Sequence, residues 1–335
     1  MRPNDTAPEM QTQEGVATWR NEAEPEWQSV ISRWACWFEE TRRAYGAFEW
    51  VTFAYFGWLL GIFAVFHRNL AHPGEKAIIH MLVLCAIVTL CRVGARRSNK
   101  FLDFARHWYP LPLYLWLFEE LTSLVHAILP GWYDRLLIEF DYNFAGVHPS
   151  VWLARFANPA LNDFMQFAYL TYFLYLVILP AILYVQRDRL AFWTVMVSTA
   201  VSHYSVYVIA LLFPVESPYY SLASLQTKEL TGGGVTALIN LIERFGRVHG
   251  AAFPSAHVGG SMMAMLAAWR YKRWLFCICL PFFVCMCVAT IYGRYHYVAD
   301  VLGGLAVGTA GFLVGSWLMQ RRGAVPEVAG GEDSD

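Results

Sequence analysis

Residues 294–319 read RYHYVADVLGGLAVGTAGFLVGSWLM, and this stretch decides the class of fold. Its greater part, residues 298–319, is almost wholly apolar and has about the length that a helix needs to cross the hydrocarbon core of a membrane. His296 and Asp300 stand at the beginning of that run. Because ionisable groups are costly inside a bilayer, a pair of them at its edge indicates a functional site.

The rest of the chain has the same apolar character. Of its 335 residues 57% are hydrophobic and only 15% are charged, a combination that soluble domains rarely show. The net charge of −1 gives no reason to expect a nucleic-acid partner. We predict an all-α polytopic integral membrane protein, a helical bundle with about eight transmembrane helices, at residues 47–66, 75–94, 109–128, 163–185, 191–213, 254–270, 274–292 and 298–319.

Four regions are expected along the chain. They are a disordered tail plus an amphipathic interfacial helix (1–46), N-terminal transmembrane helices with an extracytoplasmic segment (47–162), a transmembrane core (163–322) and a polar tail (323–335). The span at 109–128 is the weakest, because it contains Glu119 and Glu120. These carboxylates either have a partner or lie at a helix end or in a wet cleft.

Basic residues predict the orientation of the bundle. Lysines and arginines gather after the second, fourth, sixth and eighth spans, and such clusters mark the cytoplasmic side. Both termini should then be cytoplasmic, in a plasma or inner membrane. The segments that contain His257 and His296 fall together on the extracytoplasmic side.

The first of these segments reads Phe253-Pro254-Ser255-Ala256-His257. Proline suits the first turn of a helix, where a missing N–H costs nothing. The free N–H groups of Ser255, Ala256 and His257 would then form an anion site, to which the Ser255 hydroxyl adds a donor. His257 stands beside that site and can exchange a proton near neutral pH.

The second segment brings a histidine and a carboxylate together. His296 and Asp300 are four residues apart, which places them on one helical face. A carboxylate that holds one ring nitrogen makes the other a better nucleophile. Arg294 offers a fork of donors to a phosphate, and Gly303, Gly304 and Gly308 allow close packing against a neighbouring helix.

A cluster of four cysteines is a weak candidate for a metal site. Cys277, Cys279, Cys285 and Cys287 read C-x-C-x5-C-x-C. Residues two apart on a helix point to nearly opposite sides, so four thiolates would not converge on one ion. We expect these thiols to fill space inside the bundle and expect no metal and no other cofactor.

The two histidine motifs resemble those of the type-2 phosphatidic acid phosphatase superfamily. That family shows P-S-G-H and then S-R-x5-H followed by an aspartate; here Pro254, Ser255 and His257 match the first, and His296 and Asp300 the second. The resemblance implies a phosphatase-like, haloperoxidase-like core. It also implies that His296 attacks phosphorus to form a phosphohistidine, that Asp300 orients it, and that His257 protonates the leaving oxygen.

The cationic partners of the phosphate depart from the family pattern. Thr290 stands where the arginine of the family's S-R-x5-H motif is expected. The family also has a K-x6-R-P motif before the P-S-G-H motif, and no such pattern precedes His257. Residues 213–220, FPVESPYY, and the aromatic-His-Tyr-x-x-Asp pattern resemble the inositol phosphorylceramide synthase branch. Arg294 is the first choice for the phosphate partner, followed by a group of lesser candidates, Arg247, Arg244 and Lys228.

These features predict a lipid phosphate as the substrate, with water or an alcohol such as inositol as the acceptor. The lipid and the choice between hydrolysis and headgroup transfer stay open. A transporter that relays protons is the alternative from another class, but it would place ionisable residues in the middle of several spans. A lipid-binding module without turnover is the third reading, and phosphate release separates the enzyme from both.

Overall fold

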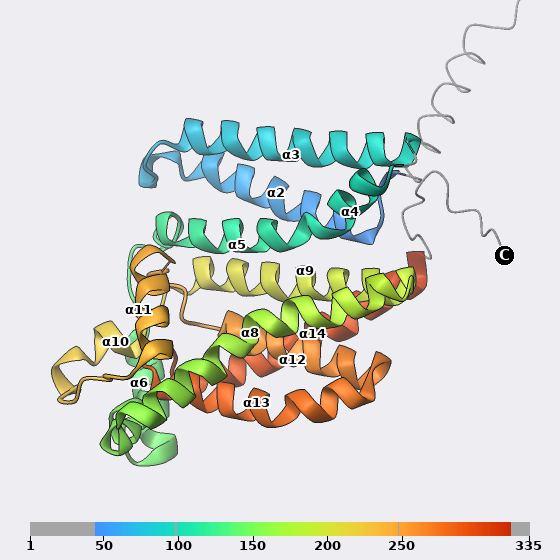
Figure 1. Cartoon of the computed structure of the whole chain (residues 1–335). Coiled ribbons are helices and arrows are strands. Elements are labelled where there is room, and N and C mark those ends of the chain that lie inside the picture. Colours follow the sequence, from blue (N-terminus) through green and yellow to red (C-terminus); the bar gives the residue numbers. More distant parts are fainter. Residues whose placement is uncertain (1–43, 98, 247, 323–335) are drawn as a thin grey trace, which may run out of the picture. The chain divides into compact units, whose positions relative to one another are not determined.

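The computed structural model describes residues 44–97, 99–246 and 248–322. The expected interfacial helix and the polar tail at 323–335 therefore lie outside the described residues. The described part is all-helical and contains no strand, as predicted (Figure 1). Its α-helices are α2 (Ala47–Val65), α3 (Pro73–Arg96), α4 (Lys100–Trp108), α5 (Pro110–Glu120), α6 (Asp134–Ala145), α7 (Pro149–Leu153), α8 (Pro159–Val185), α9 (Arg189–Leu212), α10 (Pro218–Ser221), α11 (Gly234–Gly246), α12 (Ala256–Tyr271), α13 (Arg273–Tyr292) and α14 (Val298–Arg322).

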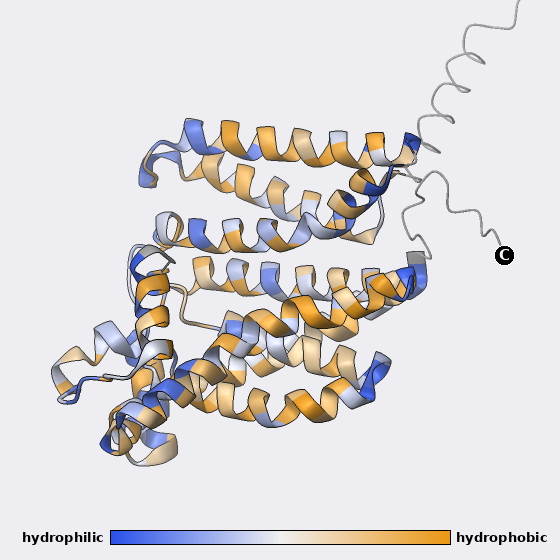
Figure 2. Ribbon diagram, viewed as in Figure 1, coloured by the Kyte–Doolittle hydropathy of each residue, from blue (hydrophilic) through white to orange (hydrophobic). Residues whose placement is uncertain are grey.

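Six of the described helices are long and apolar enough to cross a membrane: α2, α3, α8, α9, α13 and α14. Apolar residues run along these helices and polar ones gather at their ends (Figure 2). The other two expected spans are also helical but shorter, with 11 residues in α5 and 16 in α12. The multi-pass fold is confirmed, and the count of eight stays a prediction.

Glycines bring α14 into direct contact with its neighbours. A Cβ atom added to Gly304 would lie 2.7 Å from the Ser255 carbonyl oxygen, and one added to Gly308 would lie 2.2 Å from that of Gly259. The backbones of α12 and α14 can therefore approach only because these positions carry no side chain. The predicted close packing is confirmed, and it fixes the helix of His257 against the helix of Asp300.

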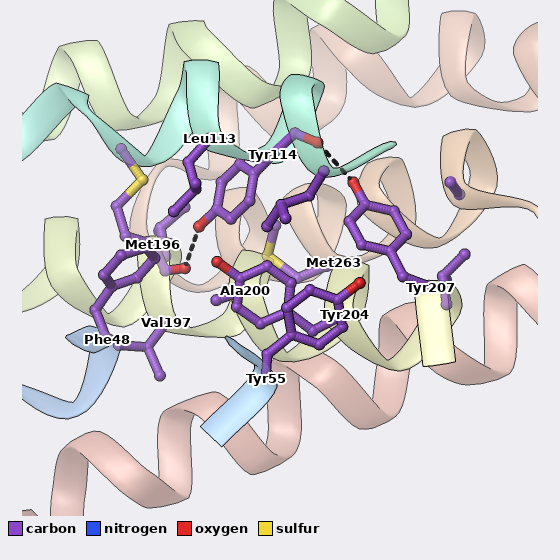
Figure 3. Close-up of a cluster of buried hydrophobic side chains, with 14 of the residues drawn as sticks. Phe48, Tyr55, Leu113, Tyr114, Met196, Val197, Ala200, Tyr204, Tyr207 and Met263 are labelled. Carbon is purple, nitrogen blue, oxygen red and sulfur yellow. Dashed lines mark hydrogen bonds between the residues drawn. The ribbon is translucent and has the colours of Figure 1, made fainter. Parts of the chain in front are cut away.

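Aromatic side chains join the N-terminal helices to α9. The rings of Tyr55 and Tyr204 stack with centroids 4.5 Å apart. The hydroxyl of Tyr114 on α5 donates to the Met196 carbonyl at 2.9 Å, and the hydroxyl of Tyr207 donates back to the Tyr114 carbonyl at 3.0 Å (Figure 3). These bonds hold α5 beside α9, so that α5 forms a fixed wall next to the C-terminal core.

The two carboxylates at the end of α5 have different surroundings. Glu120 lies 2.9 Å from Nε2 of the buried His80 and 3.6 Å from Nζ of Lys76, and so has partners on α3. Glu119 instead lines a cavity. Both outcomes anticipated from the sequence, a partner and a cleft, therefore occur on consecutive residues.

The two long connecting segments carry short helices. Residues 129–162 and 214–253, which lie between the expected spans, contain α6, α7, α10 and α11. Helices α6, α10 and α11 gather at one end of the bundle, opposite the end at which α3 and α14 finish (Figure 1). Carboxylates on α6 bind backbone N–H groups of the core, which explains why this polar segment is ordered.

Candidate active site

The first histidine motif forms the beginning of α12. The helix begins at Ala256, and Ser255 is its N-cap, whose hydroxyl oxygen accepts from Val258 N at 3.3 Å. Pro254 therefore precedes the helix instead of lying in its first turn. The N–H of Ser255 donates to the carbonyl oxygen of Asp300 at 3.0 Å, so Ser255 N is engaged, and of the three N–H groups expected to bind an anion only those of Ala256 and His257 stay candidates.

The second motif holds His296 from two sides. Its Nδ1 donates to the Ala252 carbonyl oxygen at 2.9 Å and lies 3.3 Å from Oδ2 of Asp300. The same Oδ2 accepts from Tyr297 N at 2.8 Å, as a helix cap does. Helix α14 begins only at Val298, so the two residues meet through this cap instead of sharing a helical face as predicted.

This arrangement fixes the tautomer of His296. Because the Ala252 carbonyl can only accept, Nδ1 carries the proton and Nε2 carries the lone pair. Burial lowers the pKa of His296 to about 4, although the bond to Ala252 works in the opposite direction. The imidazole is therefore neutral at pH 7, with one nitrogen ready to act as a nucleophile.

The two histidines are neighbours. The ring centroids of His257 and His296 lie 6.0 Å apart. The hydroxyl oxygen of Tyr169 is 2.8 Å from Nε2 of His257, and the ring of Tyr172 packs against the same imidazole at 4.5 Å. Tyr169 also stacks on Tyr295 at 4.5 Å. The structure therefore brings the two histidines of the two motifs side by side.

Both histidines line a cavity of about 380 Å³. Its walls come from α5, α8, α9, α11 and the start of α12, and they are mostly aromatic and aliphatic. The ionisable groups among the described lining residues are Glu119, Glu243, the two histidines and several tyrosines. Lysine and arginine are absent from that described lining.

The predicted phosphate partners lie in different places. Ala256 lines the cavity, and Ser255 is fully buried under it as the helix cap. The guanidinium of Arg294 donates to the Lys228 carbonyl oxygen and does not line the cavity. Its backbone lies in the left-handed region, with φ of 65°, which is uncommon for a residue other than glycine. Arg247 lies outside the described residues.

Sequence reasoning missed the tyrosines. Tyr169 and Tyr172 lie within an apolar span, where no pattern distinguishes them from the other tyrosines of the chain. Tyr295 adjoins His296 in the second motif, and that position was the one available signal. Two further histidines are engaged elsewhere: Nε2 of His203 bonds the Tyr172 hydroxyl at 2.8 Å, and His249 pairs with Glu216 at 2.7 Å.

No group of three metal-binding side chains converges in the part of the chain that the structure describes. The four cysteines of α13 differ in exposure, since Cys279 is buried, Cys277 is exposed, and Cys285 and Cys287 are intermediate. They do not face a common point, as the helical spacing predicts.

The comparisons with known proteins agree with the geometry. A family model described as the PAP2 superfamily matches residues 136–314, just over half of the chain. The matched region begins in α6 and contains α12, most of α14 and both histidine motifs. No curated protein and no solved structure matches the chain.

Proposed function

We propose, given that this chain belongs to the PAP2 superfamily, that it is a membrane lipid phosphatase or phosphotransferase that works through a phosphohistidine. The observation that carries the proposal is the pair of imidazoles, 6.0 Å apart, on the wall of one cavity. One of them has its tautomer fixed by a carbonyl and a carboxylate. That combination suits nucleophilic catalysis with a separate proton donor.

The surroundings of the site support a lipid substrate. Leu115 of α5, Val177 of α8 and Ile242 of α11 line the cavity, and each is two fifths or more exposed. An apolar cavity whose wall continues onto an apolar outer surface suits a phosphate ester with a hydrocarbon tail. The tail would lie along these residues while the phosphate meets the histidines.

The reaction follows from the two imidazoles. Nε2 of His296 attacks phosphorus and forms a P–N bond, while the ester P–O bond breaks. His257, in its protonated form, gives its proton to the leaving oxygen, so that the lipid departs as an alcohol. Asp300 and the Ala252 carbonyl stabilise the positive charge that develops on His296.

The second step resolves the phosphoenzyme. His257, now neutral, takes a proton from water or from an acceptor alcohol such as inositol, whose oxygen attacks phosphorus and breaks the P–N bond. Water gives phosphate, whereas an alcohol gives a new phosphodiester if the transferred group already carries one ester. Because the motifs resemble the inositol phosphorylceramide synthase branch, transfer of the phosphoryl group to an alcohol is the reaction to test first.

Stabilisation of the phosphate is assigned to the start of α12 and to arginine. The N–H groups of Ala256 and His257 point from a helix N-terminus, where anions are favoured, and Ser255 holds that turn. Arg294 and Arg247 are the proposed cationic partners. Contact of Arg294 with phosphate requires its guanidinium to leave the Lys228 carbonyl.

The site is proposed to face the extracytoplasmic side, with both termini cytoplasmic. The positively charged residues on which this orientation rests lie in the last turns of α3, α12 and α14 or shortly after α3, α8 and α12. These helix ends lie opposite the end where α6, α10 and α11 gather (Figure 1). The positive-inside rule therefore supports the assignment.

The test is turnover by the detergent-purified protein on a panel of lipid phosphates, with and without inositol, and with EDTA present. His296→Ala should abolish product formation and the acid-labile phosphoryl label on the protein. His67→Ala is the control, because His67 is exposed and bonds only the nearby Ala64 carbonyl in the described structure. Turnover that survives in His296→Ala would overturn the mechanism.

A further inference from the structure

Helix α6 places two carboxylates against the second histidine motif. Asp134 and Asp141 are seven residues apart, about two helical turns, and so lie on one face. Their exposed fractions are 7% and 2%, although α6 is a short helix at the end of the bundle. The proposed chemistry uses neither carboxylate, so their burial needs another explanation.

Asp141 caps α14 from outside. Its Oδ2 accepts from Val298 N at 2.9 Å and its Oδ1 accepts from Ala299 N at 3.1 Å. These are the first two N–H groups of α14, which have no partner within the helix. A carboxylate is the acceptor that such a helix end favours, because both N–H groups and the helix dipole stabilise its charge.

Asp134 holds the residue that precedes this helix. Its Oδ1 accepts from the Tyr297 hydroxyl at 2.9 Å, and its Oδ2 accepts from Glu216 N at 2.9 Å. The Tyr297 hydroxyl also lies 2.5 Å from the Ser221 hydroxyl. Asp134 thereby ties α6 both to the second histidine motif and to the FPVESPYY segment of the sequence.

These bonds fall on three consecutive residues, 297, 298 and 299, which lie between His296 and Asp300. Burial raises the pKa of both the Asp134 and the Asp141 carboxyl, so enclosing them has a cost that their N–H and O–H donors offset. A helix that only covered the end of the bundle would not need to bury two carboxylates at one segment.

We infer that α6 is a positioning element, and that Asp134 and Asp141 fix the segment 297–299 so that Nε2 of His296 points at the phosphorus. This inference rests on the proposed function of His296. Attack on phosphorus requires alignment to within a fraction of an ångström, and a shift of about 1 Å can cost about 10²-fold in rate. Binding of the lipid tail, which occurs on α5, α8 and α11, does not depend on this segment.

The experiment compares Asp141→Asn and Asp134→Asn with Glu139→Gln. Glu139 is an exposed carboxylate of the same helix, paired only with Arg135 in the described structure, and so controls for the loss of one charge. In Asp141→Asn an amide N–H₂ replaces one of the two acceptors and opposes an N–H donor. We expect the single-turnover rate of phosphohistidine formation to fall about 10- to 100-fold, with KM changed by less than about twofold.

A second variant guards against misfolding. Tyr297→Phe removes one hydroxyl and leaves the backbone bonds to Asp141 intact, so it should fold and lose a smaller part of the rate.

A double variant tests whether Asp141 acts through His296. In Asp141→Asn/Asp300→Asn the losses of rate should be less than additive, because both residues act through His296. All rates are taken per folded protein, from gel filtration and thermal denaturation in detergent.

The outcomes separate the two proposals. If the wild type carries no phosphoryl label on His296, the proposed function itself fails. If the wild type is labelled and Asp141→Asn, Asp134→Asn and Tyr297→Phe are labelled as fast as Glu139→Gln, only the role of α6 is overturned. A loss of rate fully explained by unfolded protein, or one that appears in KM alone, would overturn it too.

Discussion

Tyr169 of α8 and His257 of α12 meet at 2.8 Å, hydroxyl oxygen to Nε2, on the wall of the cavity. The two rings are also in contact, with centroids 4.6 Å apart. Tyr169 therefore contacts the ring of the proposed proton donor and also bonds one of its nitrogens. In the proposed reaction, the proton that His257 gives up must leave toward the substrate and not toward this hydroxyl.

Tyr169→Phe should lower the rate about three- to tenfold, because it removes one hydrogen bond worth about 1 kcal/mol and keeps the ring contacts. Tyr169→Leu, which also removes the stacking on Tyr295, should cost more. Steady-state kinetics of the two variants measure the difference. Equal rates in wild type and Tyr169→Phe would show that the hydroxyl has no part in orienting His257.

Asp300→Asn should lower kcat by about 10²- to 10⁴-fold with little change in KM, because the charge that stabilises the His296 imidazolium disappears. Asp300 is fully buried, and the amide can still accept from Tyr297 N. Asp188→Asn is the matched control, since Asp188 caps α9 at the other end of the bundle by accepting from Ala191 N. Comparable losses in both variants would indicate damage to folding instead.

The pH profile should reveal the environment of His296. Its pKa is lowered by burial to about 4, so phosphohistidine formation should keep a competent nucleophile down to about pH 5 and lose it near pH 4. Single-turnover labelling between pH 4 and pH 8, per folded protein, measures this limb. A nucleophile that titrates near the ordinary value of 6.5 would contradict the buried geometry.

The same shift predicts how stability depends on pH. The unfolded chain protonates this imidazole near pH 6.5 and the folded chain only near pH 4, so the unfolded state binds more protons between these values. This stabilising contribution is fully present above about pH 6.5 and is lost progressively as pH falls toward 4, and the loss amounts to about 3 kcal/mol. The variant His296→Gln should show a weaker loss of thermal stability over this range.

Gly308→Ala should lower the free energy of unfolding by about 1–3 kcal/mol. The added Cβ would lie 2.2 Å from the Gly259 carbonyl oxygen and would push α12 and α14 apart. Activity should fall with it, since these helices carry His257 and Asp300. Gly61→Ala is the control: a Cβ there meets nothing within 4 Å. If thermal denaturation in detergent finds the two variants equally stable, the close packing is not what holds these helices.

The sequence predicted the class of fold and the residues at the centre of the site. Apolar runs of membrane length required helices, and the order of the predicted spans and basic clusters put His257 and His296 on one side of the bundle. The meeting of His296 with Asp300 was also anticipated, although the helix begins after His296. Local spacing in the chain was enough for these conclusions because the residues concerned are close in sequence or lie at helix ends.

Contacts between distant residues were beyond the reach of such patterns. Tyr169 is separated from His257 by 88 positions, and Asp141 from Val298 by 157. Residues 129–162 contain charged, aromatic and proline positions and read as a loop, because the partners that order α6 belong to another part of the chain. For Arg294 the residue type suggested phosphate, whereas its guanidinium bonds the carbonyl of Lys228, which is 66 positions away in the chain.

Because of the glycine contact between α12 and α14, different walls of the cavity have different freedom to change. The Ser255 N–H bond to the Asp300 carbonyl and the contact at Gly304 join both histidine motifs through their backbones, so a side chain added there disturbs the chemistry itself. The opposite walls, α5, α8 and α11, contribute side chains to the cavity and belong to neither histidine motif. A mutant library aimed at a new lipid preference should therefore vary positions such as Leu115, Val177 and Ile242, and keep 253–260 and 294–308 constant.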